Sequence, residues 1–123
     1  MTIIQAINYL DYIRPNSCPQ ELKISWLSML DGKIKSEIID THEGGENILF
    51  DGYDKDTDIS SPLLVQAPYD MIYVKFLEAQ IDEYEGEAAR YACSYATFNH
   101  LFSCFERYYN KTHMPRSRKI KYF

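Results

Sequence analysis

The sequence predicts a mostly α-helical fold, a small bundle of about four helices with a long C-terminal helix. Three observations carry this prediction: apolar residues recur in steps of three or four along four segments, glycines and prolines interrupt the middle, and 123 residues suffice for one core. We expect one helical domain over residues 1–111, a loop over 41–68 within it, and a flexible basic arm over 112–123 that becomes ordered only on a partner.

The first two helices are expected near the N-terminus. In TIIQAINYLDYI the apolar residues follow helical spacing, with Thr2 as a possible N-cap and Pro15 as the stop. In NSCPQELKISWLSMLDGKIKSEIID, Pro19 suits a first helical turn, and one apolar stripe runs from Leu22 through Trp26 to Ile38. The second helix is therefore expected to continue past Gly32.

The middle of the chain breaks the helical pattern. THEGGENILFDGYDKDTDISSP contains two adjacent glycines, a third glycine and many acids, which are typical of a loop. Residues 48–50 could form a short β element that pairs with the apolar triplet 63–65, between Pro62 and Pro68, as a minimal ribbon. The alternative is an extended loop without a ribbon.

Two further helices follow. Residues 69–84 are apolar over a wide arc, which predicts a central helix. EAARYACSYATFNHLFSCFERYYNK predicts the long C-terminal helix, packed through Phe105 and Tyr109, with Pro115 beyond its end. Small residues in the first half of this helix would let another helix approach closely: Ala88, Ala89, Ala92, Cys93, Ser94 and Ala96.

Charge is distributed unevenly along the chain. Residues 1–106 hold all 18 acids and seven lysines or arginines, a formal charge of −11, whereas residues 107–123 carry +6. Binding to phosphates needs a basic face, so this distribution argues against generic nucleic-acid binding by the acidic body. Only the C-terminal segment could bind phosphate.

The cysteines and the hydropathy point to the cellular compartment. Cys18, Cys93 and Cys104 leave one cysteine unpaired in any disulfide scheme, and MTIIQAINYL lacks the regions of a signal peptide. No apolar run approaches the roughly 20 residues needed to cross a bilayer. We expect a soluble protein of a reducing cytoplasm, without a membrane partner.

Three patterns resemble metal sites and each is incomplete. Asp54, Asp56 and Asp58 match the first positions of a calcium loop, but Ile59 and Val65 stand where its glycine and glutamate belong. His100 and Cys104 share a helix face without a second ligand pair, and HEGGE, from His42 to Glu46, ends in glutamate where a metallohydrolase signature has histidine. A solvated turn explains HEGGE better.

Catalytic chemistry is not expected either. Cys93 and Cys104 occupy helix positions typical of packing residues, and no glycine-rich elbow or phosphate loop is present. We therefore expect no enzyme, no catalytic or metal-binding residue and no cofactor.

Contact between proteins accounts better for the remaining features. The acids before and at the start of the long helix are suited to one side of an intermolecular contact, and the 11 tyrosines are of a type enriched where proteins meet. The possible subunit-interface residues are Asp82, Glu83, Glu85, Glu87, Arg107 and Tyr108.

The order of several phrases is similar to that of a known family. YLDYIRPN, WLSMLDGKIKSEIIDTHEGG, LLVQAPYDMIYVKFLEAQIDEYEGE and FNHLFSCFERYYNKTHMP, followed by a basic end, span nearly the whole chain. In this order the sequence resembles the head-tail connector, or adaptor, proteins of tailed phages and prophages of Gram-positive bacteria.

The resemblance implies a structural protein of the virion. Such adaptors are mostly helical, form a ring with the twelvefold symmetry of the portal, and prolong the DNA channel towards the tail. The implied partners are the portal protein, neighbouring copies of the chain and a tail-proximal stopper or completion protein, with DNA only as passing cargo. The implied location is the head-tail interface, after assembly in the cytoplasm of the host bacterium.

The resemblance also assigns the C-terminal arm to portal contact, as a region. The arm residues are His113, Met114, Pro115, Arg116, Ser117, Arg118, Lys119, Ile120, Lys121, Tyr122 and Phe123. The alternative function is a small helical nucleic-acid-binding protein that uses the basic, aromatic tail. A third possibility is an enzyme or metal protein that uses His100, Cys104 or the loop from Asp54 to Asp58.

Overall fold

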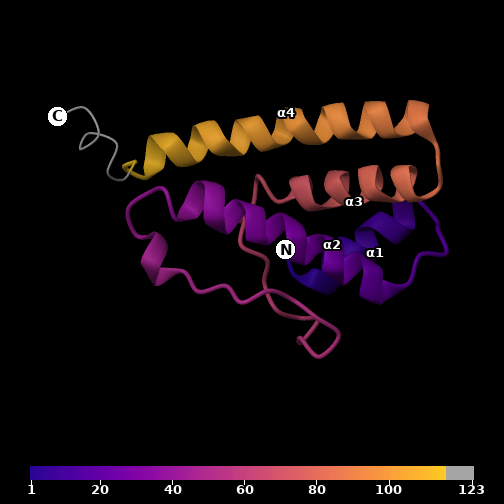
Figure 1. Ribbon diagram of the computed structural model, residues 1–123, viewed down its shortest axis with the longest axis horizontal. Helices are drawn as coiled ribbons and strands as arrows, with labels where there is room; N and C mark the ends of the chain where they lie inside the picture. Colours follow the sequence, from indigo (N-terminus) through magenta and orange to yellow (C-terminus); the bar gives the residue numbers. More distant parts are fainter. Residues whose placement is uncertain (116–123) are drawn as a thin grey trace.

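Four α-helices make up most of residues 1–115, the part of the chain that the computed structural model describes (Figure 1). They are α1 (Ile3–Ile13), α2 (Gln20–Ile34), α3 (Met71–Tyr84) and α4 (Ala88–Thr112). A π-helical turn, η1 (Lys35–Ile39), extends α2, and a 3-10 turn, η2 (Gly45–Asn47), follows. The predicted mostly α fold with a long C-terminal helix is confirmed.

Helix α1 begins and ends as its sequence predicts. The hydroxyl of Thr2 accepts from the N–H of Gln5 at 3.2 Å, and the N–H of Thr2 donates to the Gln5 side chain at 3.0 Å. This capping box satisfies two backbone donors that a helix start leaves free. The helix ends at Ile13, before Pro15, and buries a face that includes Ile3 and Leu10.

Helix α2 follows the predicted stripe. It starts at Gln20, directly after Pro19, and η1 carries the buried face on to Ile38 and Ile39. Trp26 is buried along this stripe. The π-helical turn adds one residue per turn, and here both adjacent isoleucines are buried.

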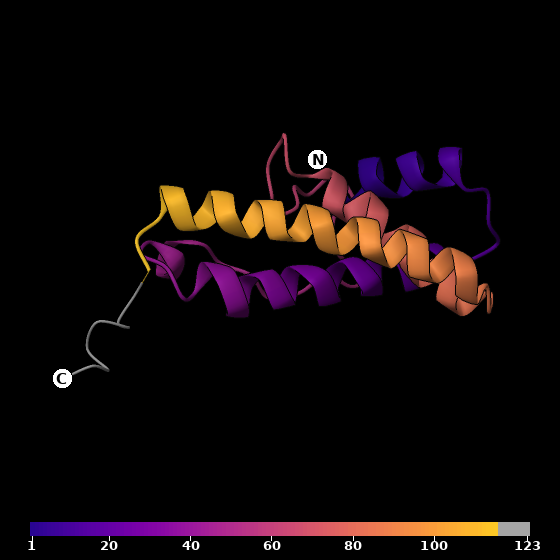
Figure 2. The same ribbon diagram turned by 90° about the horizontal axis from the view of Figure 1, so that it is seen from above.

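Helix α3 lies at the centre of the described fold, as its wide apolar arc predicts. It packs against α1, α2 and α4, and Figures 1 and 2 show it running beneath α4. Nine of its 14 residues are buried. Its contact with α4 includes the rings of Phe76 and Phe98, whose centroids lie 5.2 Å apart.

Helix α4 differs from the prediction in its first half. It buries Phe98, Phe105 and Tyr109, and Ser94 turns inward to the carboxylate of Asp82 at 2.5 Å. The other small residues are exposed, so α3 packs closely against α4 through other residues, and the role predicted for these small residues is wrong. The exposed small residues are Ala88, Ala89, Ala92, Cys93 and Ala96.

The middle of the chain is an extended loop, and the alternative of a β-ribbon is wrong. No strand forms within the described residues; only isolated bridges join Thr2 to Pro62 and His42 to Pro115. The N–H of Leu63 donates to the carbonyl of Met1 at 2.9 Å. The next two amides donate to side chains of α2 and α3, so residues 63–65 are not available to pair with 48–50.

Two glycines provide a matched test of this packing. A Cβ at Gly45 would lie 2.3 Å from the carbonyl oxygen of Ile39, whereas at Gly32, inside α2, it would meet the Phe50 ring at 3.8 Å. We expect Gly45→Ala to lower the free energy of unfolding by roughly 1–3 kcal/mol through overpacking. Gly32→Ala should raise it by roughly 0.5–1 kcal/mol, because alanine is the better helix former. Urea denaturation measures both, and the reverse order would contradict this packing.

Candidate functional site

A buried carboxylate joins the loop to the helices. Asp31 of α2 is fully buried and accepts hydrogen bonds from the hydroxyls of Tyr53, at 2.5 Å, and Tyr73, at 2.6 Å. It also accepts from the N–H of Leu64 at 3.1 Å, and the Tyr73 hydroxyl accepts from Val65 at 2.7 Å. These contacts assign Asp31 to anchoring the loop.

The electrostatics of Asp31 follow from its burial. Desolvation raises the pKa of Asp31, and the hydrogen bonds from Tyr53, Tyr73 and Leu64 oppose that rise. Burial and the neighbouring carboxylate raise the pKa of Tyr73 above its ordinary value. Sequence reasoning missed this cluster, and the one available signal was an aspartate between the apolar residues of α2.

Asp82, predicted as an interface residue, lies inside the fold. Its carboxylate is fully buried, contacts the guanidinium of Arg14 and accepts from Ser94. Arg14 also pairs with Glu78 at 3.2 Å. Asp82 therefore ties the end of α1 to α3 and α4 and cannot serve as a surface carboxylate, which corrects the prediction for this residue.

The other predicted acids lie at the surface, in the turn between α3 and α4. Glu83, Glu85 and Glu87 are exposed, and Tyr84 among them has 64% of its surface exposed. Glu87 approaches Arg90 at 3.9 Å, a contact between two exposed side chains that contributes little. We call residues 83–87 the acidic turn.

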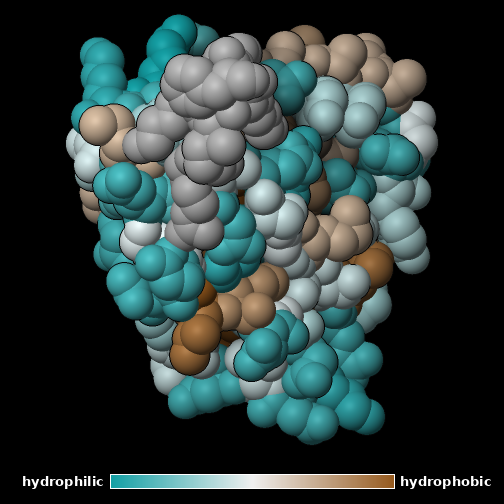
Figure 3. All heavy atoms as spheres, turned by 60° about the vertical axis from the view of Figure 1, so that its left-hand side comes forward, coloured by the Kyte–Doolittle hydropathy of each residue, from teal (hydrophilic) through white to brown (hydrophobic). Residues whose placement is uncertain are grey.

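The opposite end of α4 is basic and aromatic. The ring of Tyr108 stacks on Tyr69 at 4.7 Å, and Arg107 and Lys111 lie beside this pair. Neither cation forms an ion pair with any residue of 1–115. We call Tyr69, Arg107, Tyr108, Tyr109 and Lys111 the basic aromatic end. Figure 3 is turned to bring forward the side of the molecule on which α4 ends, where apolar groups are exposed among hydrophilic ones.

His42 lies beneath this end, and the predicted solvated turn is wrong for it. The imidazole is 5% exposed, with Nδ1 at 2.5 Å from the carbonyl oxygen of Ile38 and Nε2 at 2.6 Å from Oδ1 of Asn110. Its ring stands edge-on to Tyr109 at 4.9 Å. These contacts place His42 in the packing between the loop and α4. Both of its ring nitrogens are engaged there by Ile38 and Asn110.

The first residues of the predicted arm are attached to the body. The ring of His113 stacks on Tyr109 at 3.9 Å, and the carbonyl of Met114 accepts from the N–H of Glu43 at 2.8 Å. Pro115 forms the bridge to His42. The remaining predicted arm residues, 116–123, lie outside the described part of the chain.

The acidic turn and the basic aromatic end are far apart. Helix α4 has 25 residues and is therefore about 37 Å long, at 1.5 Å per residue. Figures 1 and 2 both show the α3–α4 turn at one end of the molecule and the end of α4 at the other. The exposed residues among the predicted interface residues thus form two separate surfaces.

The residues of the incomplete metal patterns make other contacts. Asp54 and Asp58 accept from the backbone N–H groups two residues onward, at 2.9 and 3.0 Å, which shapes the loop. His100 and Cys104 lie 3.8 Å apart, from Nε2 to Sγ. No group of three histidine, cysteine, aspartate or glutamate residues able to hold a metal occurs between residues 1 and 115.

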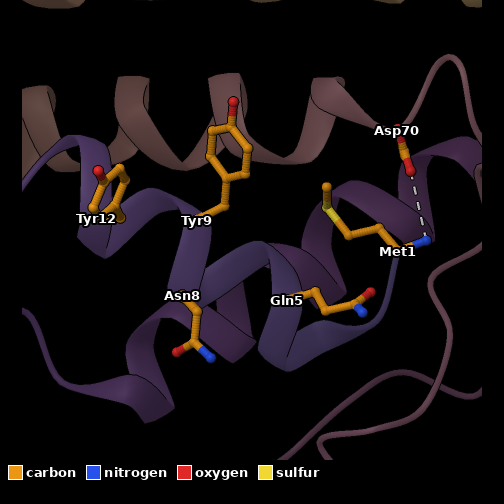
Figure 4. A pocket seen from close by; sticks show the side chains of 6 residues that line it. All are labelled: Met1, Gln5, Asn8, Tyr9, Tyr12 and Asp70. Atoms are coloured by element: carbon orange, nitrogen blue, oxygen red, sulfur yellow. Dashed lines mark ion pairs between the residues drawn. The ribbon is translucent and has the colours of Figure 1, made fainter.

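An open hollow of about 580 Å³ lies on the outer face of α1 (Figure 4). Gln5, Asn8, Tyr9 and Tyr12 contribute amide and phenol groups to it. Its charged groups, the Met1 amino group and Asp70, pair with each other at 3.6 Å. The hollow offers hydrogen-bonding and aromatic groups to a partner but brings together no nucleophile and base.

Comparison with known proteins returns no relative. No family model, curated protein or solved structure matches the chain. Within residues 1–115, every helix is too short or too polar to span a membrane.

The Asp31 cluster makes the free energy of unfolding depend on pH in the alkaline range. The raised pKa of Tyr73 means that its hydroxyl stabilises the fold fully below pH ~10 and that this contribution is lost as pH rises further. Tyr73→Phe should lower the free energy of unfolding at pH 7 by roughly 1–3 kcal/mol, because Asp31 and the Val65 amide each lose a partner. It should also flatten the decline above pH ~10, by up to about 1.4 kcal/mol per pH unit.

Urea titrations at neutral and alkaline pH measure both effects. Tyr12→Phe is the matched control, because Tyr12 is 88% exposed and its substitution should change neither value. A Tyr73→Phe variant with the alkaline slope of the parent would contradict this assignment.

The buried ion pair gives a second test. Asp82→Ala should cost roughly 3–5 kcal/mol of unfolding free energy, because Arg14 and Ser94 lose their buried acceptor. Glu83→Ala, next to it but exposed, should stay within about 0.5 kcal/mol of the parent. Thermal and urea unfolding measure both, and equal effects would place Asp82 at the surface after all.

Proposed function

We propose that this chain is a structural adaptor, a head-tail connector of a tailed bacteriophage. It forms a ring with copies of itself beneath the portal, extends the DNA channel and joins the head to a tail-proximal stopper or completion protein. Its location is the virion, at the head-tail interface, after assembly in the cytoplasm of the host. The order of its sequence phrases, which resembles that family, supports this proposal.

The single observation that carries the proposal is the separation of two unlike surfaces along α4. A closed ring of identical subunits with head-to-tail contacts needs two different, complementary patches on each subunit. The acidic turn and the basic aromatic end differ in charge, and the length of α4 separates them. An exposed acidic patch, and a basic patch whose cations form no ion pair among residues 1–115, lie at opposite ends of α4 and meet this requirement.

The acidic body suits contact with passing DNA. Exposed carboxylates at Asp51, Asp54, Asp56 and Asp58 add to those of the acidic turn. A negatively charged wall repels phosphates, so DNA moves past it without binding. DNA is cargo in this proposal.

The C-terminal arm supplies the portal contact. Residues 113–115 contact the body of the same chain, so we assign the portal contact to residues 116–123. Residues 116–121 carry four of the six cations that follow Glu106. This segment is therefore expected to bind an acidic surface of the portal protein.

Truncation after Pro115 tests the proposal. The truncated chain should keep the fold and stability of the parent, because no described contact of residues 1–115 is removed. It should lose co-purification with a portal ring, which pull-down and electron microscopy measure. A full-length variant with serine at Arg116, Arg118, Lys119 and Lys121 separates charge from length, and Lys55→Ser is the matched control on the exposed loop.

Undiminished portal binding by the truncated chain would contradict the proposal. The competing function is nucleic-acid binding, favoured by the continuation of the basic, aromatic pattern onto the surface at Arg107, Tyr108 and Lys111. Binding of an unrelated DNA oligonucleotide at ~50 mM salt, with a steep loss as salt rises, would support that function instead.

A further inference from the structure

A cavity of about 200 Å³ lies beneath the end of α4. Its walls come from η1, the loop and α4, and include Ile39, Ile48, Leu64, Phe105 and Tyr109. An apolar cavity of roughly 150 Å³ holds a benzene molecule. This cavity is therefore large enough for one aromatic ring.

One polar group in the cavity wall lacks a partner. Tyr109 is 6% exposed, and its hydroxyl has no hydrogen-bond partner among residues 1–115. Burial of a hydroxyl without a partner is costly, so native folds seldom leave one unsatisfied. A ligand that brings a hydrogen-bonding atom into the cavity would give the hydroxyl of Tyr109 a hydrogen-bond partner.

Two cations lie at the rim of the cavity, where it adjoins a neighbouring hollow. Tyr69 and Tyr108 line both this cavity and a neighbouring hollow of about 400 Å³, which Cys104, Arg107 and Lys111 also line. As described above, both cations lack a carboxylate partner within residues 1–115. The site as a whole fits an aromatic ring with a polar group, carried on an acidic segment.

The acidic turn of the same sequence has this chemistry. Tyr84 is 64% exposed and lies between Glu83 and Glu85, and its ring meets Trp26 only edge-on, at 6.3 Å. It offers a phenol ring for the cavity, a hydroxyl for Tyr109 and carboxylates for the rim. The length of α4 keeps it from reaching the cavity of its own molecule.

We propose that the cavity beneath Tyr109 receives Tyr84 of a neighbouring copy, with Glu83 and Glu85 of that copy facing Arg107 and Lys111. The inference rests on the proposed ring and deepens it, because it names the two surfaces that meet. The contact is head-to-tail, so every copy offers one cavity and one Tyr84. Such contacts continue from copy to copy until a ring closes.

Disulfide trapping with the native Cys104 tests this contact. Cys104 is partly exposed beside Arg107, whereas Cys18 is buried and Cys93 can be removed as Cys93→Ser. In that background Glu83→Cys and Glu85→Cys, made separately to allow for register, should form disulfides between copies under mild oxidation. A head-to-tail contact gives a ladder of dimers, trimers and larger species on a non-reducing gel, whereas a two-fold contact stops at dimers.

Two controls define the result. Asp56→Cys, on an equally exposed acid of the loop, should give no ladder, and Cys104→Ser should abolish the ladder of the Glu85→Cys chain.

Without cysteine substitutions, Tyr84→Ala should weaken self-association by roughly 30-fold or more, as loss of a buried interface tyrosine does. Tyr84→Phe and Tyr109→Phe should each weaken self-association less than Tyr84→Ala does. The variant with both substitutions should weaken it no more than either single substitution does.

Three outcomes would overturn the inference. One is a chain that stays monomeric up to about 1 mM in sedimentation experiments. Another is a ladder unchanged by Tyr84→Ala. The third is loss of self-association on truncation after Pro115, which would identify residues 116–123 as the occupant. Portal binding by the full-length chain, alongside any of these outcomes, would leave the proposed function standing while removing this contact.

Discussion

The hydrogen bonds accepted by the buried carboxylate of Asp31 hold together parts of the chain that share no regular pairing. Two tyrosine hydroxyls and one backbone amide converge on it from α3 and from both sides of the long loop. With them in place, the loop covers α2 and positions residues 64–69 against the end of α4. The cavity wall therefore depends on the buried Asp31 cluster, because Leu64 and Val65 line the cavity and donate to that cluster.

The second buried carboxylate, Asp82, has the same role at the opposite end. It fixes the end of α1 against α3 and α4 through Arg14 and Ser94. Its neighbours in the acidic turn are exposed, and the contacts of Asp82 hold the end of α3 from which this turn starts. Asp82 is buried in contact with α4, whereas Glu83 is exposed and Glu85 and Glu87 lie beyond the end of α3.

Much of the fold was predictable from the sequence because helical periodicity and caps are local signals. Thr2, Pro15 and the stripe ending at Ile38 identify the first two helices, and their residues behave as predicted. The burial of Asp82 was not predictable, because its partners come from other helices. The same reason explains the missed role of Asp31, whose partners lie 22 to 42 residues away.

The charge pattern of the sequence indicated two unlike surfaces. Their separation by the length of α4 is visible only in the structure. The exposed small residues of α4 were wrongly expected to lie in its contact with another helix, for a related reason. Spacing along a helix shows which residues share a face, and the rest of the fold decides whether that face is covered. In α4 the inward face is the one that carries Ser94 and Phe98.

The anchored loop shows that a segment without regular secondary structure can still be firmly hydrogen-bonded. The amides of Leu64 and Val65 belong to no helix or strand, yet both donate to buried side-chain oxygens. Their protons can exchange with solvent only when the Asp31 cluster opens, which requires α2 and α3 to part from the loop. In hydrogen exchange this irregular segment should therefore report the cooperative opening of the core, as a central helix does.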